Sequence, residues 1–363
     1  MAGLYIHIPF CRSKCIYCDF YSLPMRIDAS DYIDALLLEF NARKKEITEP
    51  FRTVYIGGGT PSVLPLSGIV RLLSSLELDW SRVEEATIEA NPEDITTEWC
   101  AAVKQAGITR VSLGVQSFID TELATVGRRH SAADALNAVR ILRNAGIRDI
   151  SIDLIYGLPG QTPDSWRSSL DTAWKTGADH LSAYTLTYEP GTRLYARRQA
   201  GKIVETDDDV IVSMYMDLTA EARRHGFNHY EISNFARIGH EARHNSAYWK
   251  GVPYLGIGAA AHSYDGCVRR WNPRSLSAYM TDPASSCEME SLDADAVHND
   301  MVMTGLRTAH GIGLTLLDES ELRLVGRYVD SGMMSLLADD RVRIAEQHWL
   351  VADSIISDLF RVG

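Results

Sequence analysis

Short apolar runs and longer amphipathic segments alternate through the first two thirds of the sequence. Two parallel strands cannot be joined by a tight hairpin, because the chain must first cross back over the sheet, and a helix usually makes this crossover. Strands that alternate with helices of this length are therefore typical of a parallel sheet covered by helices. The alternation predicts a protein of the α/β class.

About six strand–helix units can be distinguished. The predicted strands span residues 4–8, 53–56, 86–90, 110–115, 149–156 and 180–186. The predicted helices span residues 31–45, 67–76, 97–106, 132–145 and 163–176. Gly107 and Gly146 directly follow two of these helices, as glycine often does at a helix C-terminus. We interpret the pattern as an open or complete β/α barrel of the TIM type and predict a partial (β/α)6 barrel, whose functional residues should lie at the C-terminal ends of the strands.

Polar residues and glycines occupy those strand ends. They are Gly57 to Thr60, Glu89, Gln116, Asp153 and Thr187. The strands follow from the hydrophobic pattern alone. The occurrence of polar residues and glycines at their ends is therefore independent support for a site at that edge of the barrel.

The alternation of apolar runs and amphipathic segments ends after about residue 235. We predict a barrel domain over residues 1–235, a connecting segment rich in His, Gly, Tyr and Trp over residues 236–290, and a small C-terminal domain over residues 291–363. The last domain is expected to be helical or winged-helix-like, with a short hairpin at 336–344 and a final helix near 351–360.

Three of the six cysteines lie within eight residues, as Cys11-x-x-x-Cys15-x-x-Cys18, directly after the first strand. A [4Fe–4S] cluster is usually held by four thiolates, so three would leave one iron open to a small molecule. Structural zinc would require four closed ligands, and a redox dithiol needs only two cysteines. The spacing therefore favours a cluster, whereas Cys100, Cys267 and Cys287 are expected to be ordinary buried side chains.

Other residues near the strand ends suit a nucleoside ligand. Tyr17 could stack on an adenine or serve only as a packing residue. The glycines of 57–61 allow the backbone to approach a ligand closely, since no Cβ intervenes. Glu89 could accept two ribose hydroxyls or form a salt bridge at the barrel mouth.

Four motifs in this order make the chain resemble the oxygen-independent coproporphyrinogen III oxidase group of radical S-adenosylmethionine (SAM) proteins. They are Tyr5 to Cys11, Gly57 to Pro61, Gly114 to Phe118 and Asp153 to Pro159. The resemblance covers nearly the whole chain. It implies a barrel of the radical-SAM type and a [4Fe–4S] cluster bound by Cys11, Cys15 and Cys18. It also implies SAM contacts from Tyr5, Tyr17, Gly58, Gly59, Thr60, Glu89, Gln116, Arg128, Asp153 and Thr187.

Two features depart from the oxidases of this group. The cysteine motif of the oxidases has the pattern CxxxCxxCxC, but here Phe20 stands at the position of the fourth cysteine. The oxidases also carry a sizeable N-terminal extension, whereas only ten residues precede Cys11 in this sequence. In both features the sequence is similar to the haem chaperone branch of this group, the HemW family. That branch carries an HNxxYW motif associated with haem, and here the motif is His244, Asn245, Tyr248 and Trp249.

The motif suits haem, because histidine is a common axial ligand and aromatic faces pack on a porphyrin. Alternatively, His244 is a hydrogen-bonded histidine in a loop. His240 and His262 lie nearby, and the sequence does not determine which of the three histidines would bind haem iron. The segment 255–263 also resembles a family segment that closes over the site.

The resemblance implies a chaperone that binds haem and transfers it to acceptor haemoproteins, including acceptors at a membrane surface, and it is compatible with a homodimer. No catalytic residue is assigned. One alternative is an enzyme that decarboxylates porphyrinogen propionates through a 5′-deoxyadenosyl radical. Another is a radical-SAM enzyme that acts on an unrelated substrate.

Charge and hydropathy narrow the range of partners and locations. The formal net charge of −12 argues against nonspecific binding of nucleic acid, because phosphate binding requires a basic surface. No apolar run approaches the roughly 20 residues that span a bilayer. The first residues lack the layout of a signal peptide. We expect a cytoplasmic protein.

Overall fold

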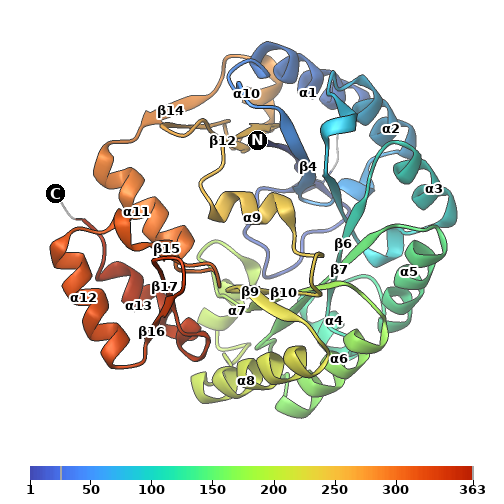
Figure 1. Ribbon diagram of the computed structural model, residues 1–363. Coiled ribbons are helices and arrows are strands. Elements are labelled where there is room, and N and C mark those ends of the chain that lie inside the picture. Colours follow the sequence, from blue (N-terminus) through green and yellow to red (C-terminus); the bar gives the residue numbers. More distant parts are fainter. Residues whose placement is uncertain (25–26, 362–363) are drawn as a thin grey trace.

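Six parallel strands lie side by side in the middle of a twelve-stranded sheet, in the order in which they occur along the chain (Figure 1). They are β1 (Ala2–Ile8), β4 (Phe51–Gly58), β5 (Glu85–Ala90), β6 (Arg110–Gln116), β7 (Asp149–Tyr156) and β8 (His180–Thr185). Each neighbouring pair is parallel. The predicted partial (β/α)6 barrel is confirmed. The computed structural model describes residues 1–24 and 27–361.

The predicted helices cover the outside of these strands (Figure 1). They are α1 (Ala29–Arg43), α2 (Leu66–Ser75), α3 (Thr97–Gln105), α5 (Ala132–Asn144) and α6 (Pro163–Lys175). Local chemistry sets where they begin. Ser131 and Asp134 form a capping box at the start of α5, and Thr162 caps α6 with a proline in its first turn.

Side chains on β1 alternate between the helices and the barrel interior, as the period of two in a strand requires. Leu4, Ile6 and Ile8 are fully buried in the apolar core. Tyr5 and His7 lie on the opposite face, toward the interior of the barrel, where Tyr5 lies near Tyr55 of β4. The interior is polar, so it can hold a site rather than only a core.

The segment 236–290, predicted to be a connecting segment, extends the sheet. From this segment, β11 (Tyr254–Ile257) pairs in parallel with β1, and β12 (His262–Tyr264), β13 (Val268–Trp271) and β14 (Glu288–Ser291) follow in antiparallel order. At the other edge, β10 (Asn234–Ala236) joins β8 to β9 (Asn228–Glu231). Strands of three or four residues are too short to show a periodic pattern, and this is why they were missed. The domain bounds remain a prediction.

Helix α9 (Arg243–Trp249) lies in the middle of the ring of strands (Figure 1). It contacts β1 and β4. The Glu85 carboxylate, at the start of β5, accepts hydrogen bonds from the backbone N–H groups of Arg243 (3.0 Å) and His244 (2.9 Å). An anion at a helix N-terminus satisfies donors that have no partner within the helix. The helix therefore closes the barrel at the N-terminal ends of the strands.

The C-terminal part of the chain combines three helices with a small sheet. The helices are α11 (Ala294–Gly305), α12 (Glu319–Asp330) and α13 (Ala352–Ser357), and the strands are β15 (Ile312–Gly313), β16 (Met334–Leu337) and β17 (Arg341–Ile344). The β16–β17 pair is the predicted hairpin. The final predicted helix is present and shorter than expected. Three helices with a small antiparallel sheet are compatible with the predicted helical or winged-helix-like fold.

Several helices were not predicted. They are α9 and, in addition, α4 (Asp120–Val126), α7 (Arg193–Gln199), α8 (Asp208–Arg224) and α10 (Leu276–Thr281). In α8, Met214, Leu218 and Ala222 are buried at intervals of four residues, so a helical signal was available there. Among the described residues, no helix combines the length and the apolar character needed to cross a membrane.

Candidate functional site

The three clustered cysteines lie at the C-terminal end of β1. Cys11 ends the two-residue strand β2 (Phe10–Cys11), and Cys15 and Cys18 follow in the loop that leads to β3 (Leu23–Pro24). All three side chains are partly exposed, and none forms a disulfide. The predicted position of the cysteines at the barrel mouth agrees with the structure.

Two donors point at the cysteine sulfurs. Thr60 Oγ1 donates to Cys11 Sγ at 3.4 Å, and Arg128 Nη1 donates to Cys15 Sγ at 3.6 Å. Such donors stabilise thiolates and tune a bound cluster. Three partly exposed thiols in one loop, with donors aimed at two of them, suit a [4Fe–4S] cluster that keeps one iron open.

Gly58 and Gly59 are required by packing at this edge. A Cβ on Gly59 would lie 2.7 Å from the carbonyl oxygen of Phe10, and one on Gly58 would lie 2.5 Å from the ring of His7. Gly58 also has a φ of +112°, which disfavours other residues. Packing between β4, β1 and the cysteine loop thus explains these glycines, and their predicted contacts with SAM stay a prediction.

Glu89 lies half-buried near the end of β5. Tyr55 Oη donates to one carboxylate oxygen at 2.8 Å, and the backbone N–H of Gly58 donates to the other at 3.1 Å. Burial raises the pKa of Glu89 to about 7. No cation forms an ion pair with Glu89 among the described residues, so the salt bridge considered in the sequence analysis is not formed.

Arg128 connects the cysteine loop to the ends of the next strands. Its Nη2 donates to Asn91 Oδ1 at 2.7 Å and also to the carbonyl oxygen of Gly114, while Nη1 reaches Cys15. The buried Nε has no partner in the described part of the chain. A guanidinium held in this way can pair with a carboxylate beside the cysteine loop.

The other predicted SAM residues lie along the same edge. Gln116 has a φ of +70° where the register of β6 and β7 shifts, which is a sparsely populated conformation for a residue with a side chain. Asp153 accepts from Ser112 Oγ at 3.2 Å inside the barrel. Tyr17 packs against a small apolar cluster, which favours its packing role, and Thr187 follows β8 with an exposed side chain.

A cavity of about 570 Å³ lies beside the cysteine loop, between β1 and the strands that extend the sheet. The segment Asp19–Tyr21 of that loop lines it, so the cavity adjoins the cysteines. The exposed ring of Phe20, which stands where the oxidases have a fourth cysteine, is part of the lining. The cavity is thus placed where a large ligand would lie next to the cluster loop.

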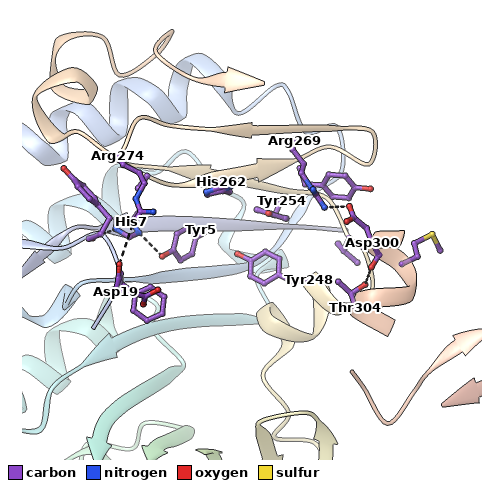
Figure 2. Close-up of a pocket in the computed structure, with 17 residues that line it drawn as sticks. Tyr5, His7, Asp19, Tyr248, Tyr254, His262, Arg269, Arg274, Asp300 and Thr304 are labelled. Atoms are coloured by element: carbon purple, nitrogen blue, oxygen red, sulfur yellow. Dashed lines mark hydrogen bonds and ion pairs between the residues drawn. The ribbon is translucent and has the colours of Figure 1, made fainter. Parts of the chain in front are cut away.

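Aromatic rings and arginines line the cavity (Figure 2). Tyr248 of α9 and Tyr254 of β11 meet edge to face with 4.5 Å between ring centroids. Arg269 forms an ion pair with Asp300 of α11, whereas Arg274 has no acidic partner among the described residues. Neither arginine was singled out in the sequence, because their surroundings depend on strand pairing.

His244, predicted as a haem ligand, is buried below this cavity, and its surroundings do not favour that role. Its side chain is 1% exposed. Nδ1 is hydrogen-bonded to Thr53 Oγ1 at 2.8 Å and Nε2 to Tyr248 Oη at 2.7 Å, so neither nitrogen is free for iron. Burial lowers its pKa to about 3. The hydrogen-bonded alternative is therefore the one the structure favours, although the histidine lies in a helix rather than a loop.

The remaining residues of the HNxxYW motif face different surroundings. Tyr248 lines the large cavity, whereas Asn245 lines a separate cavity of about 60 Å³ inside the barrel. Trp249, at the end of α9, is half-buried and lines neither cavity. The motif thus lies in the helix that closes the barrel, and Tyr248 is its one residue that lines the large cavity.

Comparisons with known proteins identify the family and the fold. Residues 5–173 match the Radical SAM superfamily. The heme chaperone HemW of Mycobacterium tuberculosis is 35% identical over 98% of this chain and 94% of its own length, and that of Bacillus subtilis is 34% identical over 93% and 91%. The structure of coproporphyrinogen III oxidase (HemN) from Escherichia coli superposes with a TM-score of 0.84 at 22% identity, covering 99% of this chain and 90% of the oxidase. This last likeness concerns the fold.

Proposed function

Because the chain belongs to the HemW family of radical SAM proteins, we propose that it binds haem and transfers it to acceptor haemoproteins in the cytoplasm or at the adjoining membrane surface. The large cavity is the observation that supports haem as the cargo. Its volume of about 570 Å³ falls in the range of pockets that bury cofactor-sized ligands. Tyrosine rings supply flat walls for a porphyrin, and Arg269 and Arg274 supply cations for its propionates.

We further propose that Cys11, Cys15 and Cys18 hold a [4Fe–4S] cluster and that Arg128 binds the carboxylate of SAM beside it. When bound, the two groups supply one-electron chemistry at the barrel mouth. The chain itself contributes the donors from Thr60 and Arg128 to the sulfurs and the carboxylate of Glu89 at the neighbouring strand end. Carrying haem requires none of this electron transfer, so the cluster is assigned to structure or regulation.

The charge of the cavity favours haem over coproporphyrinogen. Haem carries two propionates, whereas coproporphyrinogen carries four, and each carboxylate taken out of water requires a cation or other donors. The cavity offers two arginines, and Asp300 already neutralises one of them. Phe20 also places an apolar ring where the oxidases of the group have a cysteine. Oxidative decarboxylation is therefore the less supported alternative.

Two assays on the cluster-containing protein test the proposal. Titration with ferric haem should give a saturable Soret difference spectrum with one haem per chain, and the loaded protein should transfer haem to an apo-haemoprotein such as apomyoglobin. Anaerobic incubation with SAM, a reductant and coproporphyrinogen should give no sustained turnover to protoporphyrinogen. Absence of saturable haem binding, or sustained decarboxylation, would contradict the chaperone assignment.

A further inference from the structure

Three histidines lie in or directly below the large cavity, and they differ in whether a ring nitrogen is free. His7 is hydrogen-bonded through Nδ1 to Tyr5 Oη (3.0 Å) and through Nε2 to the carbonyl oxygen of Tyr21 (3.1 Å). Both nitrogens of His244 are also engaged. For His262, no hydrogen bond of either ring nitrogen is found among the described residues, and its side chain is exposed to the cavity. An axial ligand must offer a nitrogen lone pair to iron, so His262 is the one of the three that can bind iron without rearrangement.

The backbone around His262 is held rigidly. It begins β12, where it is paired with Trp271 of β13, and its ring lies against the indole of Trp271 at 6.3 Å between centroids and 29° between planes. The turn that precedes it is fixed as well. The buried carboxylate of Glu39 accepts hydrogen bonds from the backbone N–H of Gly258 (2.8 Å) and from Asn272 Nδ2 (2.7 Å). A ligand side chain mounted on a fixed element needs little ordering when it binds.

The neighbours of His262 suit a metalloporphyrin with two acid groups. In Figure 2 His262 lies between Arg274 on one side and Arg269 on the other, across the cavity from Tyr5 and Tyr248. Burial and these two arginines lower the pKa of His262, which keeps the imidazole neutral. Arg269 and Arg274 line the same cavity as this ring, so they offer cations to the two propionates of a haem whose iron is bound there.

We propose that His262 is the axial ligand of haem iron in this cavity, that Arg274 pairs with one propionate, and that Arg269, whose Nη2 holds Asp300, donates its other N–H groups to the second propionate. This inference rests on the proposed function and names its binding site. The assignment moves the iron ligand from the HNxxYW helix to β12, and it leaves Tyr248 as the part of that motif that contacts the porphyrin.

Variants of three histidines test the ligand. We expect His262→Ala to weaken haem binding about tenfold or more and to change the Soret maximum and the spin state, because the iron loses its protein ligand. His244→Gln and the exposed His310→Ala should leave both the affinity and the spectrum as in the unchanged protein. Free imidazole should restore the spectrum of a His262→Gly variant, a rescue that a merely structural role would not show. Circular dichroism and iron–sulfur content check that each variant is folded.

The propionate contacts are tested separately. Arg274→Ala should weaken haem binding about tenfold while the spectrum is retained, because a charge-assisted contact is lost and the iron ligand is not. Haem dimethyl ester, which has no carboxylates, should bind the unchanged protein and the Arg274→Ala variant equally. Arg270, which pairs with Asp265 and does not line the cavity, offers a matched control as Arg270→Ala.

The outcomes separate this inference from the proposed function. If the unchanged protein binds haem and His262→Ala retains the affinity and the spectrum, the haem-carrying function stands and His262 is overturned as the ligand. If His244→Gln alone changes the spectrum, the ligand lies in the HNxxYW helix and α9 must move to expose it. If the unchanged protein binds no haem, the proposed function itself is overturned.

Discussion

The imidazole of His244 lies against the ring of Tyr55, with 5.1 Å between ring centroids and 25° between ring planes. The hydroxyl of the same tyrosine donates to Glu89 at the opposite end of the strands. A continuous series of contacts therefore runs from the helix that closes the barrel to the edge where the cysteines lie. The HNxxYW motif has a structural role in this barrel that its sequence does not reveal.

Replacing His244 should cost folding stability. His244→Ala removes two buried hydrogen bonds and the stacked ring and leaves a cavity, so we expect the free energy of unfolding to fall by about 2–4 kcal/mol. Tyr248→Phe removes only one of the hydrogen-bonding groups and should cost about 1 kcal/mol. Urea unfolding followed by circular dichroism measures both values. Equal stability of His244→Ala and the unchanged protein would contradict the structural role.

The same histidine should make stability depend on pH. Its pKa is about 3 in the folded protein, against 6.5 as the ordinary value, because burial disfavours the charged ring. Between these values the unfolded chain binds a proton that the folded protein does not, so stability is full above pH 6.5 and falls as the pH is lowered. In His244→Gln, the slope of unfolding free energy against pH should be smaller by about one proton. Parallel slopes for the two proteins between pH 4.5 and 6.5 would argue that His244 is already charged when folded.

The buried ion pair of Glu39 and Arg43 should be essential for the fold around β11. The two groups lie 2.6 Å apart and are almost completely buried. Arg43→Met leaves the Glu39 carboxylate without its cation, and we expect a loss of about 3–5 kcal/mol in unfolding free energy. Lys44→Met, one residue away, removes a surface pair with the exposed Glu77 and should cost about 0–1 kcal/mol. Thermal and urea unfolding of the two variants provide the comparison.

The cluster cysteines should differ from the scattered ones. Cys15→Ala removes one of three thiolates, so the anaerobically reconstituted protein should lose its brown chromophore and most of its bound iron and sulfide. Cys267→Ala, an exposed cysteine outside the loop, should keep both. Iron and sulfide analysis with absorption spectra decides the matter. Normal cluster content in Cys15→Ala would refute the assignment of this cysteine.

Arg128 and Arg129 form a natural pair of variants for SAM binding. Arg128 lies over the cysteine loop, whereas Arg129 is exposed to solvent. Arg128→Ala should raise the dissociation constant for SAM by about tenfold or more, since a charge-assisted contact is lost, and Arg129→Ala should leave it unchanged. Equilibrium dialysis with labelled SAM on the cluster-containing variants measures this. Equal affinities for both variants would remove Arg128 from the predicted SAM site.

The site at the strand ends could be predicted because the alternation of apolar strand segments with amphipathic helical segments locates the end of each strand in the sequence. Apolar runs mark the strands, and the residues that follow them, such as Glu89 and Gln116, are brought to one edge by the parallel arrangement itself. The cysteine loop was equally predictable, since its spacing is local. His262 was only one of three candidate histidines, and Arg269 and Arg274 were not singled out. Short antiparallel strands carry no periodic signal, and the position of these residues depends on pairing with distant residues.

The sequence by itself determined the parallel barrel and the loop with Cys11, Cys15 and Cys18, because local spacing and hydrophobic pattern are enough to specify them. Only the tertiary structure decided which histidine faces the large cavity. From the sequence alone, His244 and His262 are both plausible haem ligands. His244 is buried with both nitrogens hydrogen-bonded. His262 lies in the cavity wall, where neither nitrogen has a hydrogen bond from the residues that the structure describes. This difference arises from contacts with residues far away along the chain.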